Sequence, residues 1–241
     1  MATTPVEPAA GFARKRRSVA FWIAATGFGP LLFYFAFSTL YIGAWYAITR
    51  HQGPPTPEVL LNSVLATLPP AEWGVVFVWW LTQRRRTRFA DLFGLRTRGI
   101  AVDVLIGLAL GAAWVTMYGL GDVVAFADMF RVDLAKLASV PMSVTAGCCE
   151  ELLCRGFLFT VLAQAGGGWK SKLLGSCVTF SLMHILWGPW GMGWTFLLAV
   201  TFGAVTLWRR SIWAAVIAHT LLDLCIEPGL FAKALQGGFG S

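Results

Sequence analysis

The chain has few charged residues. Asp, Glu, Lys and Arg make up 13% of its 241 residues, whereas 57% are apolar and the mean hydropathy is +0.66. An average soluble domain carries about 25% charged residues. The sequence is too apolar for a disordered chain and has too little polar surface for a water-soluble domain. It therefore predicts an integral membrane protein.

The chain also lacks the motifs of several soluble protein classes. Its five cysteines include no C-x-x-C pair, which argues against a zinc finger and a disulfide framework. It has neither a dinucleotide-binding nor a phosphate-binding glycine motif. Two basic clusters, 14–17 and 84–86, lie at the ends of apolar runs, where Lys and Arg set membrane orientation. We therefore expect no nucleic-acid partner, despite the net charge of +7.

Apolar stretches dominate the rest of the sequence, and a bilayer span takes about 20 such residues. We expect an all-α polytopic transmembrane bundle of about seven spans, between six and eight, with an interfacial amphipathic helix at 121–138. The expected spans are residues 18–49, 59–82, 100–120, 139–162, 173–187, 194–208 and 212–226. Gly107 and Gly111, at G-x-x-x-G spacing, predict close packing of the third span against another helix.

The distribution of basic residues predicts the orientation of this bundle. Most of the 19 Lys and Arg residues fall in the N-terminal segment and in the connections that lie on the same side of the membrane. By the positive-inside rule, the N-terminus is cytoplasmic and the C-terminus lies outside. We expect a protein of the bacterial inner membrane, with the lipid bilayer as its permanent partner.

Ionisable residues inside the later spans break the apolar pattern. They are Glu150, Glu151 and Arg155 in the fourth span, His184 in the fifth, and His219 and Asp223 in the seventh. Each charged group at the bilayer centre costs roughly 3 kcal/mol on insertion scales, so four of them approach the whole net stability of a domain, about 5 to 15 kcal/mol. Asp103 and Glu72 lie near a span end and a proline pair, and neither is expected to need a buried partner.

Three interpretations account for these groups. A structural polar network explains Glu151 and Arg155, which are one helical turn apart. A proton or ion relay is the second, although the chain shows no inverted repeat. The third is hydrolysis, in which a carboxylate and an imidazole activate water while a second imidazole stabilises the oxyanion. Two imidazoles and a carboxylate could equally bind zinc, although no H-E-x-x-H motif is present.

The order of these motifs resembles a known family. E-E-x-x-x-R at 150–155, F-x-x-x-H at 180–184 and H-x-x-x-N/D at 219–223 look like the CPBP family of intramembrane proteases, which includes the CAAX prenyl endopeptidases and the abortive-infection type membrane proteins. The resemblance covers about 139–226, and the N-terminal half contributes no motif. It implies three parts, namely a basic cytoplasmic tail at 1–17, membrane spans and an interfacial helix at 18–138, and a catalytic core at 139–241.

The resemblance also implies roles for the site residues. Glu150 would be the general base that activates water, supported by His184, while His219 and Asp223 would stabilise the oxyanion. Asp223 stands where many relatives have Asn, so its carboxyl must be protonated or bonded to His219. Glu151 with Arg155 would be a structural clamp.

The family has been described as metalloproteases, and a metal-free glutamate mechanism has also been proposed for it. The resemblance therefore leaves a zinc cofactor open. If a metal is used, Glu150, His184 and His219 would be its ligands.

Two cysteines, Cys148 and Cys149, directly precede the glutamates. Such small polarizable residues commonly pack helix contacts. Alternatively, one is an accessory thiol that faces the site, since a Cys at this position resembles the myxosortase branch, thought to cleave C-terminal sorting tails that bear Cys. A CAAX-like substrate would instead present a lipidated Cys. Both imply a membrane-anchored protein substrate cut near its C-terminus. A non-enzymatic membrane immunity or scaffold protein is the remaining alternative.

Overall fold

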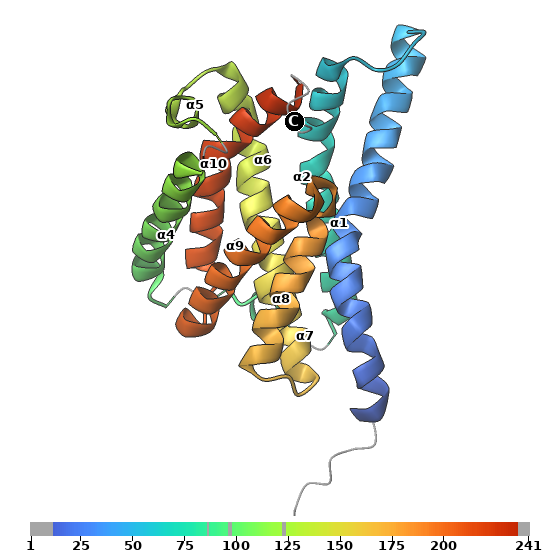
Figure 1. Ribbon diagram of the computed structural model, residues 1–241. Coiled ribbons are helices and arrows are strands. Elements are labelled where there is room, and N and C mark those ends of the chain that lie inside the picture. The colour runs from blue at the N-terminus through green and yellow to red at the C-terminus, as the bar shows by residue number, and fades with distance from the viewer. Residues whose placement is uncertain (1–11, 86, 96–97, 122–123, 236–241) are drawn as a thin grey trace, which may run out of the picture.

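The chain folds into a bundle of helices (Figure 1). The computed structural model describes residues 12–85, 87–95, 98–121 and 124–235, and these contain no strand. In chain order the elements are α1 (Phe12–Thr49), α2 (Pro57–Gln83), α3 (Phe89–Leu92), α4 (Ile100–Leu120), α5 (Phe126–Phe130), α6 (Leu134–Glu151), the π-helix η1 (Leu152–Phe157), α7 (Leu158–Gln164), α8 (Trp169–Met183), the 3₁₀ turn η2 (Ile185–Trp187), α9 (Gly188–Arg209) and α10 (Trp213–Leu235). The fold class predicted from the sequence is confirmed.

Apolar helices identify an integral membrane protein. Within the described residues, four helical stretches are long and apolar enough to cross a bilayer, and they are Ala20–Thr49, Glu58–Gln83, Ile100–Leu120 and Ile185–Arg209. The other expected spans correspond to the continuous α6–η1–α7 segment, to α8 and to α10. These three are shorter or carry ionisable residues, and they hold the polar groups of the site.

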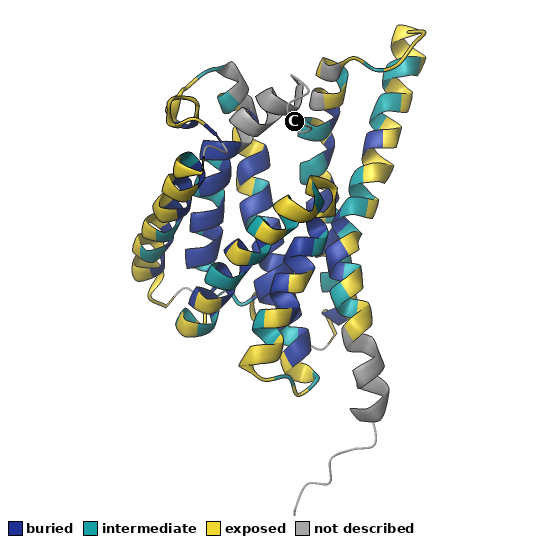
Figure 2. Cartoon of the chain, viewed as in Figure 1, coloured by how far each residue is buried: buried dark blue, intermediate teal, exposed yellow. Residues whose placement is uncertain are grey.

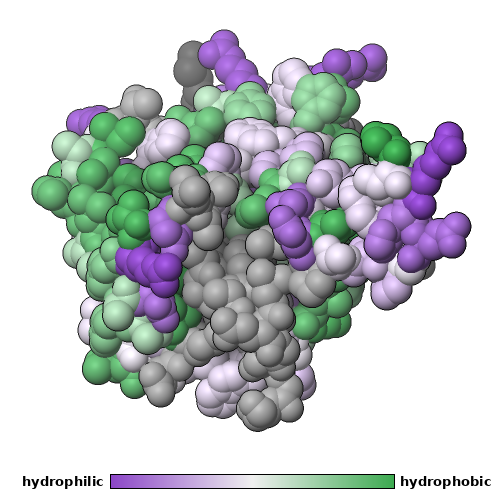
Figure 3. All heavy atoms as spheres, turned by 90° about the horizontal axis from the view of Figure 1, so that it is seen from above, coloured by the Kyte–Doolittle hydropathy of each residue, from purple (hydrophilic) through white to green (hydrophobic). Residues whose placement is uncertain are grey.

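The buried residues gather on α6, η1, α8 and α10, while α1 and α4 expose much of their outer surface (Figure 2). Large apolar side chains of α4 point outward, as expected for contact with lipid. The view from the end at which α1 joins α2 shows this hydrophobic flank on the left (Figure 3). The exposed residues of α4 include Ile100, Val102, Val104, Leu105, Leu108, Met117 and Leu120.

The G-x-x-x-G pair of α4 faces α10. A Cβ atom at Gly107 would lie 2.7 Å from the carbonyl oxygen of Ala214, and one at Gly111 would lie 3.0 Å from that of Ala218. The two backbones approach so closely that only glycine fits at Gly107 without a shift. The contact fixes α10, which carries two residues of the site, against α4.

Several helix boundaries differ from those expected. The basic cluster 14–17 belongs to the first turns of α1, and residues 1–11 of the expected tail lie outside the described residues. Helix α2 continues through Pro69 and Pro70, which neighbouring helices make tolerable in a membrane protein. The expected interfacial segment 121–138 divides between the short α5 and the start of α6, where Asp133 caps the helix by accepting from the backbone N–H of Lys136 at 2.9 Å.

Helix α8 ends at Met183, below the tops of α1 and α2 (Figure 1). The chain then makes the turn η2 and enters α9 at Gly188, with a proline in the first positions of the helix, where proline is favoured. Helix α9 therefore begins six residues before the expected span 194–208. Because α8 ends at Met183, His184 lies directly at the C-terminal end of the helix, where it is half-buried.

Candidate active site

Three helical elements bring the ionisable residues together. Glu150 and Glu151 end α6, Arg155 lies in η1, and His219 and Asp223 lie one turn apart on α10. All five residues are buried. The π-helix begins directly after the glutamates, and such insertions into α-helices often occur at functional sites.

Glu151 is the centre of a buried hydrogen-bond network. Its Oε1 accepts from Arg155 Nη1 at 2.8 Å and from His219 Nδ1 at 3.0 Å, and the side chains of Glu151 and Arg155 are 0% exposed. Arg155 also donates through Nη2 to the carbonyl of Ala199 at 3.4 Å, and its guanidinium lies 4.5 Å from the ring centre of Phe180. The i, i+4 pair expected from the sequence is present, and it connects η1 to α9 and α10.

His219 contacts all three carboxylates of the site. Its Nδ1 faces Glu151, while its Nε2 lies 3.4 Å from Asp223 Oδ2 and 3.9 Å from Glu150 Oε2. Because the Glu151 carboxylate accepts, Nδ1 carries a proton. Three carboxylates surround one guanidinium and one imidazole, so a second proton on the imidazole or on Asp223 reduces the excess of buried negative charge.

Glu150 differs from its neighbour in both partners and exposure. Its Oε2 is buried and has no hydrogen-bond partner among the described residues. Its side chain is 12% exposed, whereas that of Glu151 is 0% exposed. Of the two adjacent glutamates, Glu150 is the one that can reach a ligand in the site.

His184 lies where α8 ends. Its Nδ1 donates to the carbonyl of Phe180 at 2.8 Å, since a carbonyl can only accept, so Nε2 keeps its lone pair in the neutral ring. The imidazole packs against Phe180 and Trp187, and Phe180 also contacts His219 at 5.5 Å between ring centres. In the described part of the chain no hydrogen bond joins His184 to Glu150 directly.

The expectation that Asp103 and Glu72 need no buried partner was wrong. Asp103 on α4 is 0% exposed and accepts from Arg209 Nε at 2.7 Å, and Glu72 on α2 is only 2% exposed. Asp103 and Arg209 are 106 residues apart, so no local spacing indicates their pairing. The only available signal was that both lie at the same expected side of the membrane.

The comparison with protein families identifies the segment that holds these residues. Residues 133–225 match the model of a family described as type II CAAX prenyl endopeptidase Rce1-like. This match supports the resemblance to the CPBP family that the three motifs indicate. The matched segment begins at the cap of α6 and ends within α10, so it contains every residue of the site. Neither the comparison with curated proteins nor that with solved structures found a match for the chain.

The two cysteines that directly precede the glutamates have different surroundings. Cys149 is 0% exposed in a hydrophobic cluster with Val75 and Val76 of α2, which is the packing position that most buried cysteines occupy. Cys148 is half-buried at the edge of the same cluster. Of the two thiols, Cys148 has the greater access to a ligand.

A zinc ion is the cofactor to test against this candidate site. In the described ranges no group of three His, Cys, Asp or Glu side chains could hold a metal ion. The Nε2 of His219 lies 3.9 Å from Glu150 Oε2, but the structure does not place His184 with them as a third ligand. The residues do not fit a zinc site as arranged, so we derive no step through a metal.

Proposed function

We propose that the protein is an intramembrane endopeptidase that hydrolyses a peptide bond near the C-terminus of a membrane-anchored protein. The observation that supports this most is the contrast between two consecutive glutamates. Glu151 accepts hydrogen bonds from Arg155 and His219 and is fully buried, whereas Glu150 is partly accessible and its Oε2, 3.9 Å from His219 Nε2, has no hydrogen bond among the described residues. A purely structural network would gain little from a carboxylate left without a hydrogen bond, because burying an unsatisfied polar group is costly.

Glu150 acts as the general base in this proposal. A water molecule donates one hydrogen bond to Glu150 and another to the lone pair on His184 Nε2. Glu150 takes the proton as the water oxygen attacks the carbonyl carbon. It then passes that proton to the leaving amine when the C–N bond breaks. General acid–base help of this kind contributes typically 10²- to 10⁴-fold to the rate.

His219 stabilises the oxyanion that forms on the attacked carbonyl. With Nδ1 donating to Glu151, the protonated ring presents Nε2–H toward the space between Glu150 and Asp223. Asp223 shares this proton in the resting site and keeps the imidazole charged. The clamp of Glu151 and Arg155 fixes the ring before the reaction, which is what makes oxyanion stabilisation effective.

The orientation follows from the charged ends of the bundle. The connections between α2 and α4, α7 and α8, and α9 and α10 share one end, and they contain most of the Lys and Arg residues in the connections (Figure 1). By the positive-inside rule this end, with the N-terminus, faces the cytoplasm of a bacterial inner membrane.

The substrate class is a lipidated or Cys-containing membrane-anchored protein. The half-buried Cys148 beside Glu150 favours a myxosortase-like sorting protease as the second candidate.

The test compares the membrane proteins of cells that express the wild type or Glu150→Gln. Mass spectrometry of C-terminal peptides should find a processed substrate only with the wild type, while the variant accumulates in the membrane to the same level. Glu58→Gln, at an exposed position in the first turn of α2, is the matched control and should process normally.

Normal processing by Glu150→Gln would refute the mechanism. Processing by neither protein would favour the immunity or scaffold alternative. Adding a zinc chelator to the cleavage assay tests metal dependence separately, and the metal-free mechanism predicts no loss of activity.

A further inference from the structure

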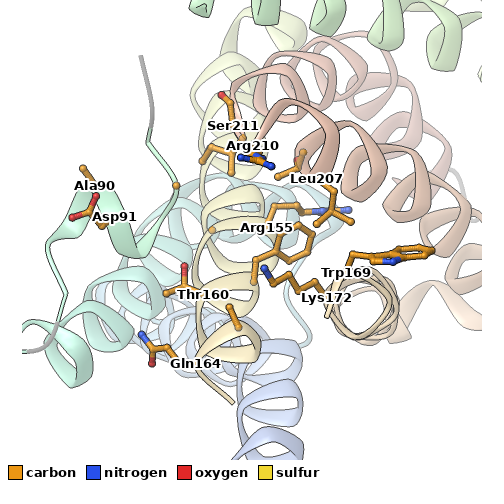
Figure 4. Close-up of a pocket in the computed structure, with 16 residues that line it drawn as sticks. Ala90, Asp91, Arg155, Thr160, Gln164, Trp169, Lys172, Leu207, Arg210 and Ser211 are labelled. Carbon is orange, nitrogen blue, oxygen red and sulfur yellow. The ribbon is translucent and has the colours of Figure 1, made fainter. Parts of the chain in front are cut away.

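A cavity at the basic end of the bundle includes Arg155 in its lining but not Glu151. This cavity of about 700 Å³ is lined by residues of α3, η1, α7, α8 and α9 and by the connection from α9 to α10 (Figure 4). Three of its lining residues are cations, namely Arg155, Lys172 and Arg210, and one is an acid, Asp91. The mechanism proposed above uses none of these residues except Arg155.

The charge of this cavity is unbalanced. Arg155 is neutralised by Glu151, but in the described part of the chain Lys172 and Arg210 have no ion pair. Figure 4 shows both cations on the same cavity as Arg155, with Asp91 on the opposite wall. The cavity therefore carries a surplus of positive charge and attracts an anion.

Two residues that line this cavity also contain buried polar atoms without hydrogen-bond partners. The Nε of Arg155 and the Oγ1 of Thr206 are both buried and lack hydrogen-bond partners among the described residues. Arg155 is 2% exposed and Thr206 is 4% exposed. Unpartnered buried polar groups are uncommon and costly in folded proteins. Both groups can donate a hydrogen bond, so this wall of the cavity favours acceptor atoms such as the oxygens of an anion.

The backbone of Arg210 provides a further indication. This residue ends α9 with φ 54° and ψ 35°, a left-handed conformation that glycine adopts at little cost and arginine does not. A glycine there would terminate the helix more favourably. The strained position instead holds a guanidinium, and that guanidinium lines the cavity.

We propose that this cavity binds the phosphate group of an anionic lipid headgroup. Arginine forks bind phosphate oxygens in pairs, and lysine adds a point charge. Trp169 lines the cavity and is 61% exposed, and tryptophan prefers the headgroup level of a membrane. Basic pockets between transmembrane helices are a known form of headgroup site. This location and the size of the cavity favour a lipid over free phosphate.

The test measures lipid binding to the purified full-length protein in neutral detergent. Native mass spectrometry should show retention of phosphatidylglycerol in preference to phosphatidylcholine, and phosphatidylglycerol should raise the Tm. Arg210→Gly and Lys172→Gln should each weaken binding about fivefold, because each basic residue near a lipid headgroup contributes about 1 kcal/mol. Arg210→Gly also relieves backbone strain, so its weaker binding cannot be attributed to unfolding.

Arg50 supplies the matched control. It has nearly the same backbone conformation, with φ 53°, and is exposed like Arg210, but it lies at the other end of the bundle and does not line the cavity. Arg50→Gly removes the same charge and should leave lipid binding unchanged. Glu150→Gln should also bind lipid like the wild type, so a failure of the protease proposal is distinguishable from a failure of this one.

Three results would overturn the proposal. They are equal retention of the two lipids, equal effects of Arg210→Gly and Arg50→Gly, and a rise in Tm with inorganic phosphate but not with phosphatidylglycerol. The last result would assign the cavity to a soluble phosphate compound.

Discussion

Replacing Arg155 with methionine leaves the carboxylate of Glu151 buried with one hydrogen-bond donor in place of two. Both side chains are 0% exposed, and the Oε2 of Glu151 has no partner among the described residues, so Oε1 accepts both hydrogen bonds of this carboxylate. Removing one partner of a buried ion pair costs about 3–5 kcal/mol, and we expect Arg155→Met to destabilise the protein by that amount.

A double-mutant cycle separates this cost from lost packing. Glu151→Gln removes the charge of the partner, so Arg155→Met made in the Glu151→Gln background should cost less than in the wild type, with a coupling of at least about 1.5 kcal/mol. Unfolding in detergent, followed by the fluorescence of the 12 tryptophans, supplies the free energies. Arg85→Met, at an exposed position, is the control and should have little effect. Additive effects of the two changes would refute the reasoning, because they would show that the pair is not coupled.

Three further predictions concern the packing of α4, its ion pair with α9, and His184. Gly107→Ala should destabilise the protein by about 1–3 kcal/mol in the same unfolding assay, because its Cβ would lie 2.7 Å from a backbone carbonyl of α10. Gly43→Ala is the control and should not destabilise the protein, because a Cβ at Gly43 has no neighbour within 4 Å. Asp103→Asn should cost about 1.5 kcal/mol, less than Arg155→Met, because the side chain of Arg209 is 24% exposed and water can reach it; an equal cost would contradict this. His184→Phe should reduce cleavage of the identified substrate about 10²- to 10⁴-fold while leaving the Tm nearly unchanged, and an unchanged rate would remove His184 from the mechanism.

The sequence predicted the helices better than their ends. Apolar runs identify membrane helices because a bilayer requires about 20 apolar residues, and this requirement is met locally. The end of α8 depends on a turn at His184 and on the glycine and proline that open α9, which are tertiary features in an apolar background. Hydropathy alone therefore assigned residues 188–193 to a connection.

The site was predictable as a set of residues but not as a network. The motifs identify Glu150, Glu151 and His219, since charges inside spans need a reason. The hydrogen bond from His219 to Glu151 crosses 68 residues of sequence, and nothing in the local pattern indicates which glutamate it selects. The pair of Asp103 and Arg209 was missed for the same reason.

The geometry of a helix explains why two adjacent glutamates can serve different purposes. Successive residues on an α-helix point about 100° apart, so Glu150 and Glu151 cannot face the same neighbour in the same way. An imidazole with nitrogens on two sides of its ring can contact both, and His219 does so with Nδ1 at 3.0 Å from Glu151 and Nε2 at 3.9 Å from Glu150. Contact with the buried, Arg155-bound glutamate fixes the ring, and the opposite nitrogen is thereby aimed at the accessible one. The buried pair of Glu151 and Arg155 thus orients the imidazole of His219 toward Glu150.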